Sequence, residues 1–133
     1  PVNMTWGIEN RTTALRVINM KDTNTRIETR VPGADSNPYL AMAACLAAGL
    51  YGIEHQLALK DQPITGNAYD DRKANRLPTN LAEATKTLKK SKRAAEVLGK
   101  EFVDYYVNTR ELEWKEYEKS VSDWELNRYG EII

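Results

Sequence analysis

The sequence is poor in several residues that would point to particular kinds of protein. It has one cysteine, one histidine and one phenylalanine among 133 residues, and its 19 Lys plus Arg balance its 19 Asp plus Glu. A single cysteine, Cys45, excludes a disulfide within the chain and is typical of a reducing compartment. Balanced charge gives no general attraction to nucleic acid or to an anionic membrane. We therefore expect a cytoplasmic protein that has neither as a partner.

The chain also lacks a hydrophobic run of membrane-spanning length. The most apolar stretch, Tyr39 to Ile53, is uncharged and rich in alanine, but it is shorter than the roughly 20 residues that a membrane helix needs. Asn37 is a good helix N-cap and Pro38 suits the first helical position. The pattern predicts a buried helix from there to about Leu59. The only histidine, His55, follows this run and is expected to be exposed or capping.

The first 36 residues instead show the two-residue period of strands. Three β-prone segments are expected at Val2–Trp6, Thr12–Ile18 and Arg26–Val31, with residues 19–24 as a hairpin connection. We predict that these strands pair in an antiparallel sheet. Residues 1–36 would thus supply strands, which also carry the charged residues of the candidate active site described below, and residues 37–133 would be mainly helical.

The later part of the chain carries helix signals separated by breakers. Lys60–Pro78 is expected to be a loop, long enough to be either functional or packed against parts that this chain lacks. Asn80 with Glu83 resembles a capping box that opens a helix to about Lys90. A short helix at Ala94–Leu98 would close at Gly99, and one long helix would span Glu101–Tyr129. The predicted fold class is α+β: antiparallel strands, then a buried Ala-rich helix, then further helices.

Arginines and one carboxylate are concentrated in the strand region. Arg26, Glu28 and Arg30 would line one face of an extended strand, with Ile27, Thr29 and Val31 facing a core on the other. Arg11 and Arg16 lie just upstream. If these two serve one site, Arg11 must precede the strand or sit at a bulge, because their odd spacing would otherwise send them to opposite faces. Such a set is typical of a site for phosphate groups and a divalent cation.

Two interpretations of this strand are open. A solvent-facing strand often alternates Arg and Glu, because opposite charges across a sheet stabilise it modestly. The choice of arginine over lysine at all four cationic positions favours a binding site, since the planar guanidinium grips phosphate or carboxylate with two hydrogen bonds. Other charged groups are expected to be structural: the adjacent Asp70 and Asp71 as a solvated turn, and the lysines around Lys89 as an exposed helix face.

The same stretch resembles a known family. It is similar to the C-terminal part of the catalytic domain of glutamine synthetases, and in particular to the branch with γ-glutamylamide and γ-glutamylpolyamine synthetases. The resemblance is close over Thr5–Glu54 and looser beyond it. The residues that carry it are Asn10-Arg11, Arg16, Arg26-Ile27-Glu28-Thr29-Arg30, Pro32, Asn37-Pro38-Tyr39-Leu40-Ala41, Ala43-Ala44, Ala48-Gly49-Leu50 and Gly52-Ile53.

The resemblance implies an ATP-dependent ligase that joins glutamate to ammonia or an amine through γ-glutamyl phosphate. Arg11 would stabilise the transferring phosphoryl group, and Arg16 and Arg26 would hold the ATP phosphates. Glu28 would ligate Mg²⁺ or Mn²⁺, and Arg30 would bind a carboxylate of glutamate. The resemblance also implies a ring-type homo-oligomer, a dodecamer, for a longer parent protein of which this chain would be an inactive piece.

Two other classes remain open beside this one. Some relatives of the family have lost activity and serve structural roles, and the same superfamily includes guanidino kinases. The Asn37-Pro38-Tyr39-Leu40 helix start favours the ligase branch, and the presence of Arg11, Glu28 and Arg30 together favours an active parent.

Overall fold

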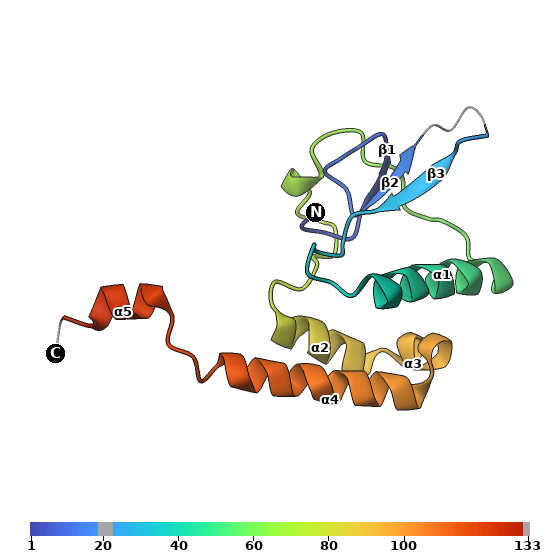
Figure 1. Ribbon diagram of the computed structural model, residues 1–133. Helices are drawn as coiled ribbons and strands as arrows, with labels where there is room; N and C mark the ends of the chain where they lie inside the picture. Colours follow the sequence, from blue (N-terminus) through green and yellow to red (C-terminus); the bar gives the residue numbers. More distant parts are fainter. Residues whose placement is uncertain (19–22, 132–133) are drawn as a thin grey trace. The chain divides into compact units, whose positions relative to one another are not determined.

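The computed structural model describes residues 1–18 and 23–131. The chain divides into two compact units, Pro1–Leu77 and Pro78–Ile133, each of which has its own architecture. The first unit contains a small sheet, one long helix and a 3₁₀ turn, and the second is helical (Figure 1). The predicted α+β class is confirmed. The predicted hairpin connection at residues 19–24 falls largely outside the described residues.

The sheet has three short strands in the order β1-β2-β3. They are β1 (Trp6–Ile8), β2 (Leu15–Ile18) and β3 (Arg26–Thr29). The pairing of β2 with β3 is antiparallel, as predicted, but β1 and β2 run parallel. The backbone explains the difference. The N–H groups of Ala14 and Leu15 both donate to the Thr5 carbonyl, so β2 starts beside the start of β1 and runs the same way.

The first strand also lies later than the sequence predicts. Within Val2–Trp6 only Trp6 belongs to β1, and Asn3 forms a single bridge with Arg76. The buried Asn3 side chain uses its amide to bind backbone instead: Nδ2 donates to the Ala68 carbonyl at 2.6 Å, and Oδ1 accepts from the Thr5 hydroxyl at 2.8 Å. Hydrogen bonds made by an Asn side chain in this way compete with the regular backbone pairing of a strand.

The long segment between Lys60 and Pro78 packs along the strand region. The Ile64 N–H donates to the Trp6 carbonyl, the Met4 N–H to Asn75, and the Leu77 N–H to Val2. The 3₁₀ turn η1 (Ala68–Asp70) places Ala68 in the small core of this unit, which also contains Thr13, Ala14 and Ile18. A segment expected to be a loop therefore supplies backbone partners that hold the strand region in place.

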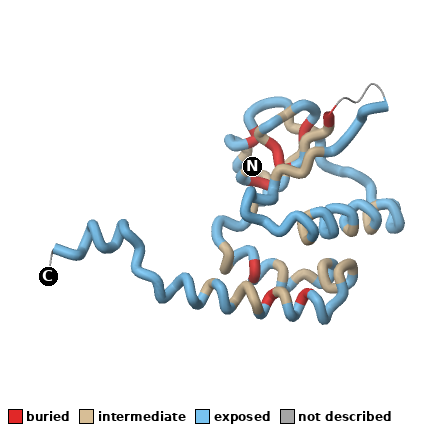
Figure 2. The backbone as a smooth tube through the Cα atoms, in the orientation of Figure 1, coloured by how far each residue is buried: buried red, intermediate tan, exposed pale blue. Residues whose placement is uncertain are grey.

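The Ala-rich helix is α1 (Pro38–Glu54), with Asn37 as N-cap and Pro38 at its first position, as predicted. It ends five residues earlier than the predicted Leu59, because Gln56 adopts a left-handed φ of 48° and His55 caps the helix. The prediction that it is buried is wrong for this chain: none of its residues is buried (Figure 2). Cys45 is exposed as well. Large apolar side chains of α1 are exposed, among them Tyr39, Leu46 and Ile53.

The second unit is a set of helices in which α2 (Leu81–Lys90) and α3 (Lys92–Leu98) pack on α4 (Lys100–Tyr117). Val103, Val107 and Thr85 are its buried residues. Asn80 caps α2 as predicted, but the Glu83 carboxylate accepts from the Thr79 N–H rather than from Asn80. Gly99 separates α3 from α4 with a φ of 88°, a conformation that only glycine adopts without strain.

The predicted single helix over Glu101–Tyr129 is interrupted. It consists of α4 and a separate α5 (Asp123–Tyr129), which begins at a capping box formed by Ser122 and Glu125. The Ser122 hydroxyl accepts from the Glu125 N–H, and the Glu125 carboxylate accepts from the Ser122 N–H, which stabilises the start of a new helix there. No helix of residues 1–18 and 23–131 is long and apolar enough to cross a membrane.

Candidate functional site

The charged residues of the strand region meet around Glu28. Register places Arg16 directly opposite Glu28 across the β2–β3 pair. Arg30 Nη1 donates to Glu28 Oε1 at 2.8 Å, and Arg16 Nη1 lies 3.5 Å from Glu28 Oε2. We call Glu9, Arg16, Glu28 and Arg30 the β2–β3 charge cluster. The antiparallel pairing brings Arg16 opposite Glu28, twelve positions on in the chain, and the parallel pairing of β1 with β2 brings Glu9 beside Arg16.

The surrounding arginines hold Glu28 in its charged form. The hydrogen bond from Arg30 lowers the pKa of the Glu28 carboxyl most, and the nearby charges of Arg16, Arg30 and Arg11 lower it further, while partial burial opposes them. A carboxylate that stays ionised is a hard oxygen donor and can ligate Mg²⁺ or Mn²⁺. Its side chain is 38% exposed, so an external group can reach it.

Two guanidinium groups of the cluster have spare donors. The Nε atoms of Arg16 and Arg30 are buried and have no hydrogen-bond partner within the described residues. Buried donors of this kind cost free energy unless an acceptor satisfies them, so the arginines fit an anion such as phosphate or carboxylate. Among the described residues no group of three His, Cys, Asp or Glu could hold a metal ion. Glu28 therefore fits a divalent cation as one ligand, not as a complete site.

Arg11 lies on the turn before β2, as its spacing from Arg16 requires. Asn10 fixes this turn: its Oδ1 accepts from the Thr12 N–H at 2.9 Å, and its Nδ2 donates to the carbonyls of Ile64 and Gly66. The exposed Arg11 guanidinium makes no ion pair within the described residues, but its charge acts on Glu28. The structure thus brings Arg11, Arg16, Glu28 and Arg30 into one neighbourhood.

Arg26 is placed differently. It lies at the start of β3, exposed, and its Nη1 donates to the Asn24 carbonyl at 3.3 Å. It forms no ion pair with any described carboxylate, and the structure does not bring its guanidinium into the charge cluster. Register pairs it with Ile18, two positions along β2 from Arg16.

The opposite face of β3 departs from expectation. The pattern predicts that Ile27 and Val31 face a core, yet Ile27 is 67% exposed and Val31 is also exposed. Thr29 on this face has a contact with α1, because its hydroxyl lies 3.6 Å from the Cys45 sulfur. The predicted alternation of side chains along β3 is correct. Within the described residues, however, α1 covers little of the apolar face of β3.

Sequence reasoning missed Glu9 and the structural role of Asn10. Glu9 Oε2 pairs with Arg16 Nη2 at 2.5 Å. No local pattern signals this pair, because it depends on the parallel pairing of β1 with β2. Asn10 is different: an Asn followed two residues later by Thr is a recognisable turn signal, since the Asn side chain accepts from the backbone two residues on.

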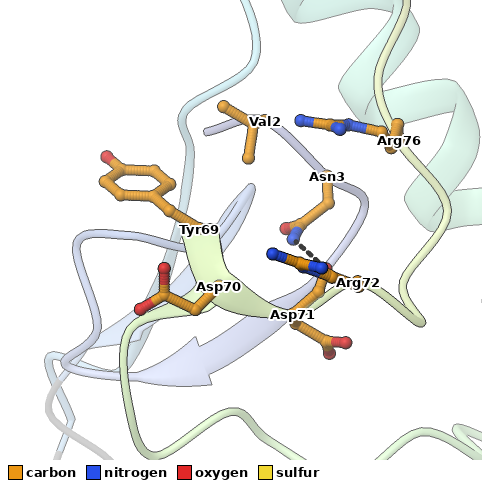
Figure 3. Close-up of a pocket in the computed structure, with 7 residues that line it drawn as sticks. All are labelled: Val2, Asn3, Tyr69, Asp70, Asp71, Arg72 and Arg76. Carbon is orange, nitrogen blue, oxygen red and sulfur yellow. Dashed lines mark hydrogen bonds between the residues drawn. The ribbon is translucent and has the colours of Figure 1, made fainter.

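The other charged candidates make contacts within the chain. A pocket of about 540 Å³ is lined by Val2, Asn3, Tyr69, Asp70, Asp71, Arg72 and Arg76 (Figure 3). Its two aspartates point apart, and both are occupied: Asp71 Oδ1 accepts from the Lys73 N–H, and Asp70 Oδ2 accepts from Asn67. His55 stacks on Tyr51 at the end of α1. Lys89 pairs with Glu111 on an exposed helix face.

Comparison with known proteins identifies the family of this chain. The family model for the glutamine synthetase catalytic domain matches residues 1–129. The chain belongs to the glutamine synthetase family. The predicted family is therefore confirmed, including the branch, because the relatives that follow comprise both glutamine synthetases and ligases for other amines.

Relatives in the glutamine synthetase family are similar over essentially the whole chain. Type-1 glutamine synthetase 2 of Dictyostelium discoideum is 52% identical over 136 residues, covering 100% of this chain and 26% of that protein. Glutamate–isopropylamine ligase of a Pseudomonas species is 44% identical, covering 98% and 29%. A solved structure, apo GmaS without ligand, superposes with a TM-score of 0.82 at 33% identity, covering 98% and 30%. The chain thus spans between a quarter and a third of the length of these family members.

Proposed function

We propose that this chain is the C-terminal part of the catalytic domain of an ATP-dependent ligase that joins glutamate to ammonia or an amine. In this reaction the γ-carboxylate of glutamate attacks the terminal phosphorus of ATP, which gives γ-glutamyl phosphate and ADP. The amine then attacks the γ-carbonyl carbon, phosphate leaves, and the amine loses a proton. The first step spreads negative charge over the transferred phosphoryl group, so fixed cations supply much of the catalysis.

The proposal rests on one observation: Arg16 and Arg30 both form ion pairs with Glu28, and the charge of Arg11 is close enough to act on the same carboxylate. Three guanidinium groups around one ionised carboxylate can bind a polyanion together with a cation. Arg11 stabilises the phosphoryl group during its transfer. Arg16 and Arg26 bind ATP phosphates. Arg30 binds a glutamate carboxylate. The unpartnered Nε atoms of Arg16 and Arg30 are donors that such anions would satisfy.

A divalent metal ion, Mg²⁺ or Mn²⁺, would neutralise phosphate charge when bound, and Glu28 is the residue here that would hold it. Magnesium sites usually combine one or two carboxylates with water and substrate phosphates. A single protein ligand in this chain is consistent with that, provided that the longer parent protein contributes the others. We therefore expect the isolated 133-residue chain to release no ADP on its own.

The experiment is an assay of the full-length parent protein for ADP release. The assay omits glutamate, amine or metal in turn and compares ammonia with alkylamines and polyamines. We expect release that needs all of glutamate, an amine or ammonia, ATP and a divalent metal. Release of ADP with a guanidino substrate in place of glutamate would indicate a kinase, and the absence of release with every substrate would indicate a non-catalytic family member. Robust turnover by the isolated chain would contradict its being an incomplete part.

The remaining expectations concern the parent protein as a whole. We propose that it is a cytoplasmic homo-oligomer of the ring type. Native mass spectrometry of the purified parent would measure the number of subunits, and a monomer would contradict this part of the proposal.

A further inference from the structure

Arg16 lies between two carboxylates that come from the strands on either side of it. Its Nη2 is 2.5 Å from Glu9 Oε2, at the end of β1, and its Nη1 is 3.5 Å from Glu28 Oε2, on β3. The side chain of Arg16 is only 14% exposed, so these two carboxylates decide where its guanidinium lies. The contact with Glu9 is a close ion pair, while that with Glu28 is at the limit of a hydrogen bond.

The backbone fixes Glu9 in this position. Its φ is 52°, in the left-handed region that residues other than glycine, asparagine and aspartate seldom adopt. Its N–H donates to the Val17 carbonyl at 2.9 Å, which extends the parallel β1–β2 pairing by one residue beyond Ile8. This backbone position presents the Glu9 side chain beside Arg16, the neighbour of Val17 on β2.

We propose that Glu9 is a positioning residue that draws Arg16 away from Glu28 and so leaves Glu28 Oε2 open to a divalent cation. This inference rests on the proposed function, in which Glu28 is a metal ligand. Arg30 already occupies Oε1 at 2.8 Å, so Oε2 is the oxygen with capacity to spare. Without the charge of Glu9, Arg16 has a single carboxylate partner left and closes on Oε2, where it competes with the cation.

The test uses the full-length parent and replaces Glu9 in two ways. Glu9→Gln keeps the size of the side chain and removes its charge, whereas Glu9→Asp keeps the charge on a shorter stem. Mn²⁺ binding is followed directly by electron paramagnetic resonance of the free ion, without nucleotide. In parallel, ADP release is measured against Mn²⁺ and Mg²⁺ concentration. Residues that orient a ligand typically change metal affinity by about 10–100-fold when they are replaced.

We expect Glu9→Gln to weaken Mn²⁺ binding by at least about 10-fold and Glu9→Asp to weaken it less. The metal concentration for half-maximal ADP release should rise in parallel. The control, Glu111→Gln, removes the carboxylate of the exposed ion pair with Lys89, whose length of 2.7 Å is comparable. We expect this control to leave Mn²⁺ binding unchanged.

The outcomes separate this inference from the proposed function. If the wild type releases ADP as expected but Glu9→Gln binds Mn²⁺ as tightly as the wild type, Glu9 is only structural and the inference is wrong. If Glu9→Gln weakens Mn²⁺ binding in a protein that releases no ADP, the inference stands and the proposed function fails. A wild type that binds no Mn²⁺ overturns the inference. If Glu9→Gln does not fold, the Glu9→Asp titration decides, and unchanged Mn²⁺ binding there contradicts the role of Glu9.

Discussion

The turn that carries Arg11 depends on two small residues. Asn10 ties the turn to the segment after Pro63 through hydrogen bonds to the Ile64 and Gly66 carbonyls. Gly7 allows this approach: a Cβ at its position would lie 2.8 Å from the Ile64 carbonyl oxygen and 2.9 Å from Asn10 Cβ. The placement of Arg11 beside the charge cluster therefore rests on close backbone packing that only glycine permits at position 7.

Gly7→Ala is expected to destabilise the chain. The added methyl group meets backbone that cannot move without breaking the hydrogen bond of the Ile64 N–H to the Trp6 carbonyl. Overpacking of this kind costs about 1–3 kcal/mol. Urea unfolding measures the loss, with Gly66→Ala as the control, because a Cβ there meets nothing within 4 Å. Equal free energies of unfolding for the two variants would show that the close approach is unimportant.

Arg11→Lys in the full-length parent is expected to lower ADP release strongly while the protein still folds. Arg11 is exposed and makes no ion pair within the described residues, so its loss leaves no partner unsatisfied there. A lysine keeps the charge but not the planar fork that binds two oxygens of a phosphoryl group. Steady-state ADP release tests this, with thermal melting as the control. Wild-type turnover in the variant would remove Arg11 from the proposed site.

At the level of residues, the sequence was sufficient to group Arg11, Arg16, Glu28 and Arg30. The reasons were the strand period, the position of Arg11 before the strand, and the family resemblance. It was not sufficient for Glu9, because the Glu9–Arg16 pair arises from a parallel alignment that no local pattern encodes. It also placed Arg26 with the others, whereas the described contacts leave Arg26 at the start of β3, bonded to the Asn24 carbonyl. The catalytic roles of all five site residues remain predictions.

The helix ends are set by side chains that bind backbone. Glu83 shows how this works in α2: its carboxylate accepts from both the N–H and the hydroxyl of Thr79, at 2.9 and 3.0 Å, while Asn80 caps the Glu83 amide. The hydrogen bond from the Thr79 N–H lowers the pKa of Glu83 most, followed by that from the Thr79 hydroxyl. The stability of the start of the second unit therefore depends on the charge of Glu83.

The contribution of Glu83 to stability is expected to depend on pH in one direction. Because the folded state lowers its pKa, the stabilisation is complete above the ordinary glutamate range and is lost as pH falls through the lowered pKa. Glu83→Gln should therefore be less stable than the wild type at pH 7, and the difference should shrink in acid. Urea unfolding from pH 7 to pH 3 measures it, with Glu113→Gln as a matched exposed control in α4. A difference that is constant over this range would contradict the role of the Thr79 contact.

Element boundaries were predictable where a cap marks them. Asn37, Pro38 and Asn80 each open a helix as their chemistry predicts, and Gly99 separates two. The break between α4 and α5 was missed, although Ser122 and Glu125 form a recognisable capping box. The apolar stripe continues through the break at helical spacing, and periodicity alone therefore favoured one long helix. The parallel alignment of β1 with β2 could not be predicted, since it depends on hydrogen bonds to Thr5.

At the scale of the molecule, much apolar surface is left exposed. Tyr39, Leu46 and Ile53 of α1 and Trp124 of α5 are all more than half exposed. Exposed apolar patches of this kind usually mark surfaces that contact other protein. The chain spans only 26–30% of the length of the relatives described above. We propose that the rest of the parent protein covers α1, which would reconcile its apolar composition with its exposure here.

The most direct test of the central claim is the metal dependence of ADP release by the full-length parent with Glu28→Gln. This substitution keeps the size of the side chain and one oxygen but removes the charge that Arg16 and Arg30 hold. If Glu28 ligates the metal ion, the rate at limiting metal should fall by about 10²–10³-fold. Excess Mn²⁺ should restore part of it, and thermal melting should confirm that the variant is folded. Near-wild-type rates for folded Glu28→Gln at limiting metal would instead mean that the strand is an ordinary salt-bridged surface.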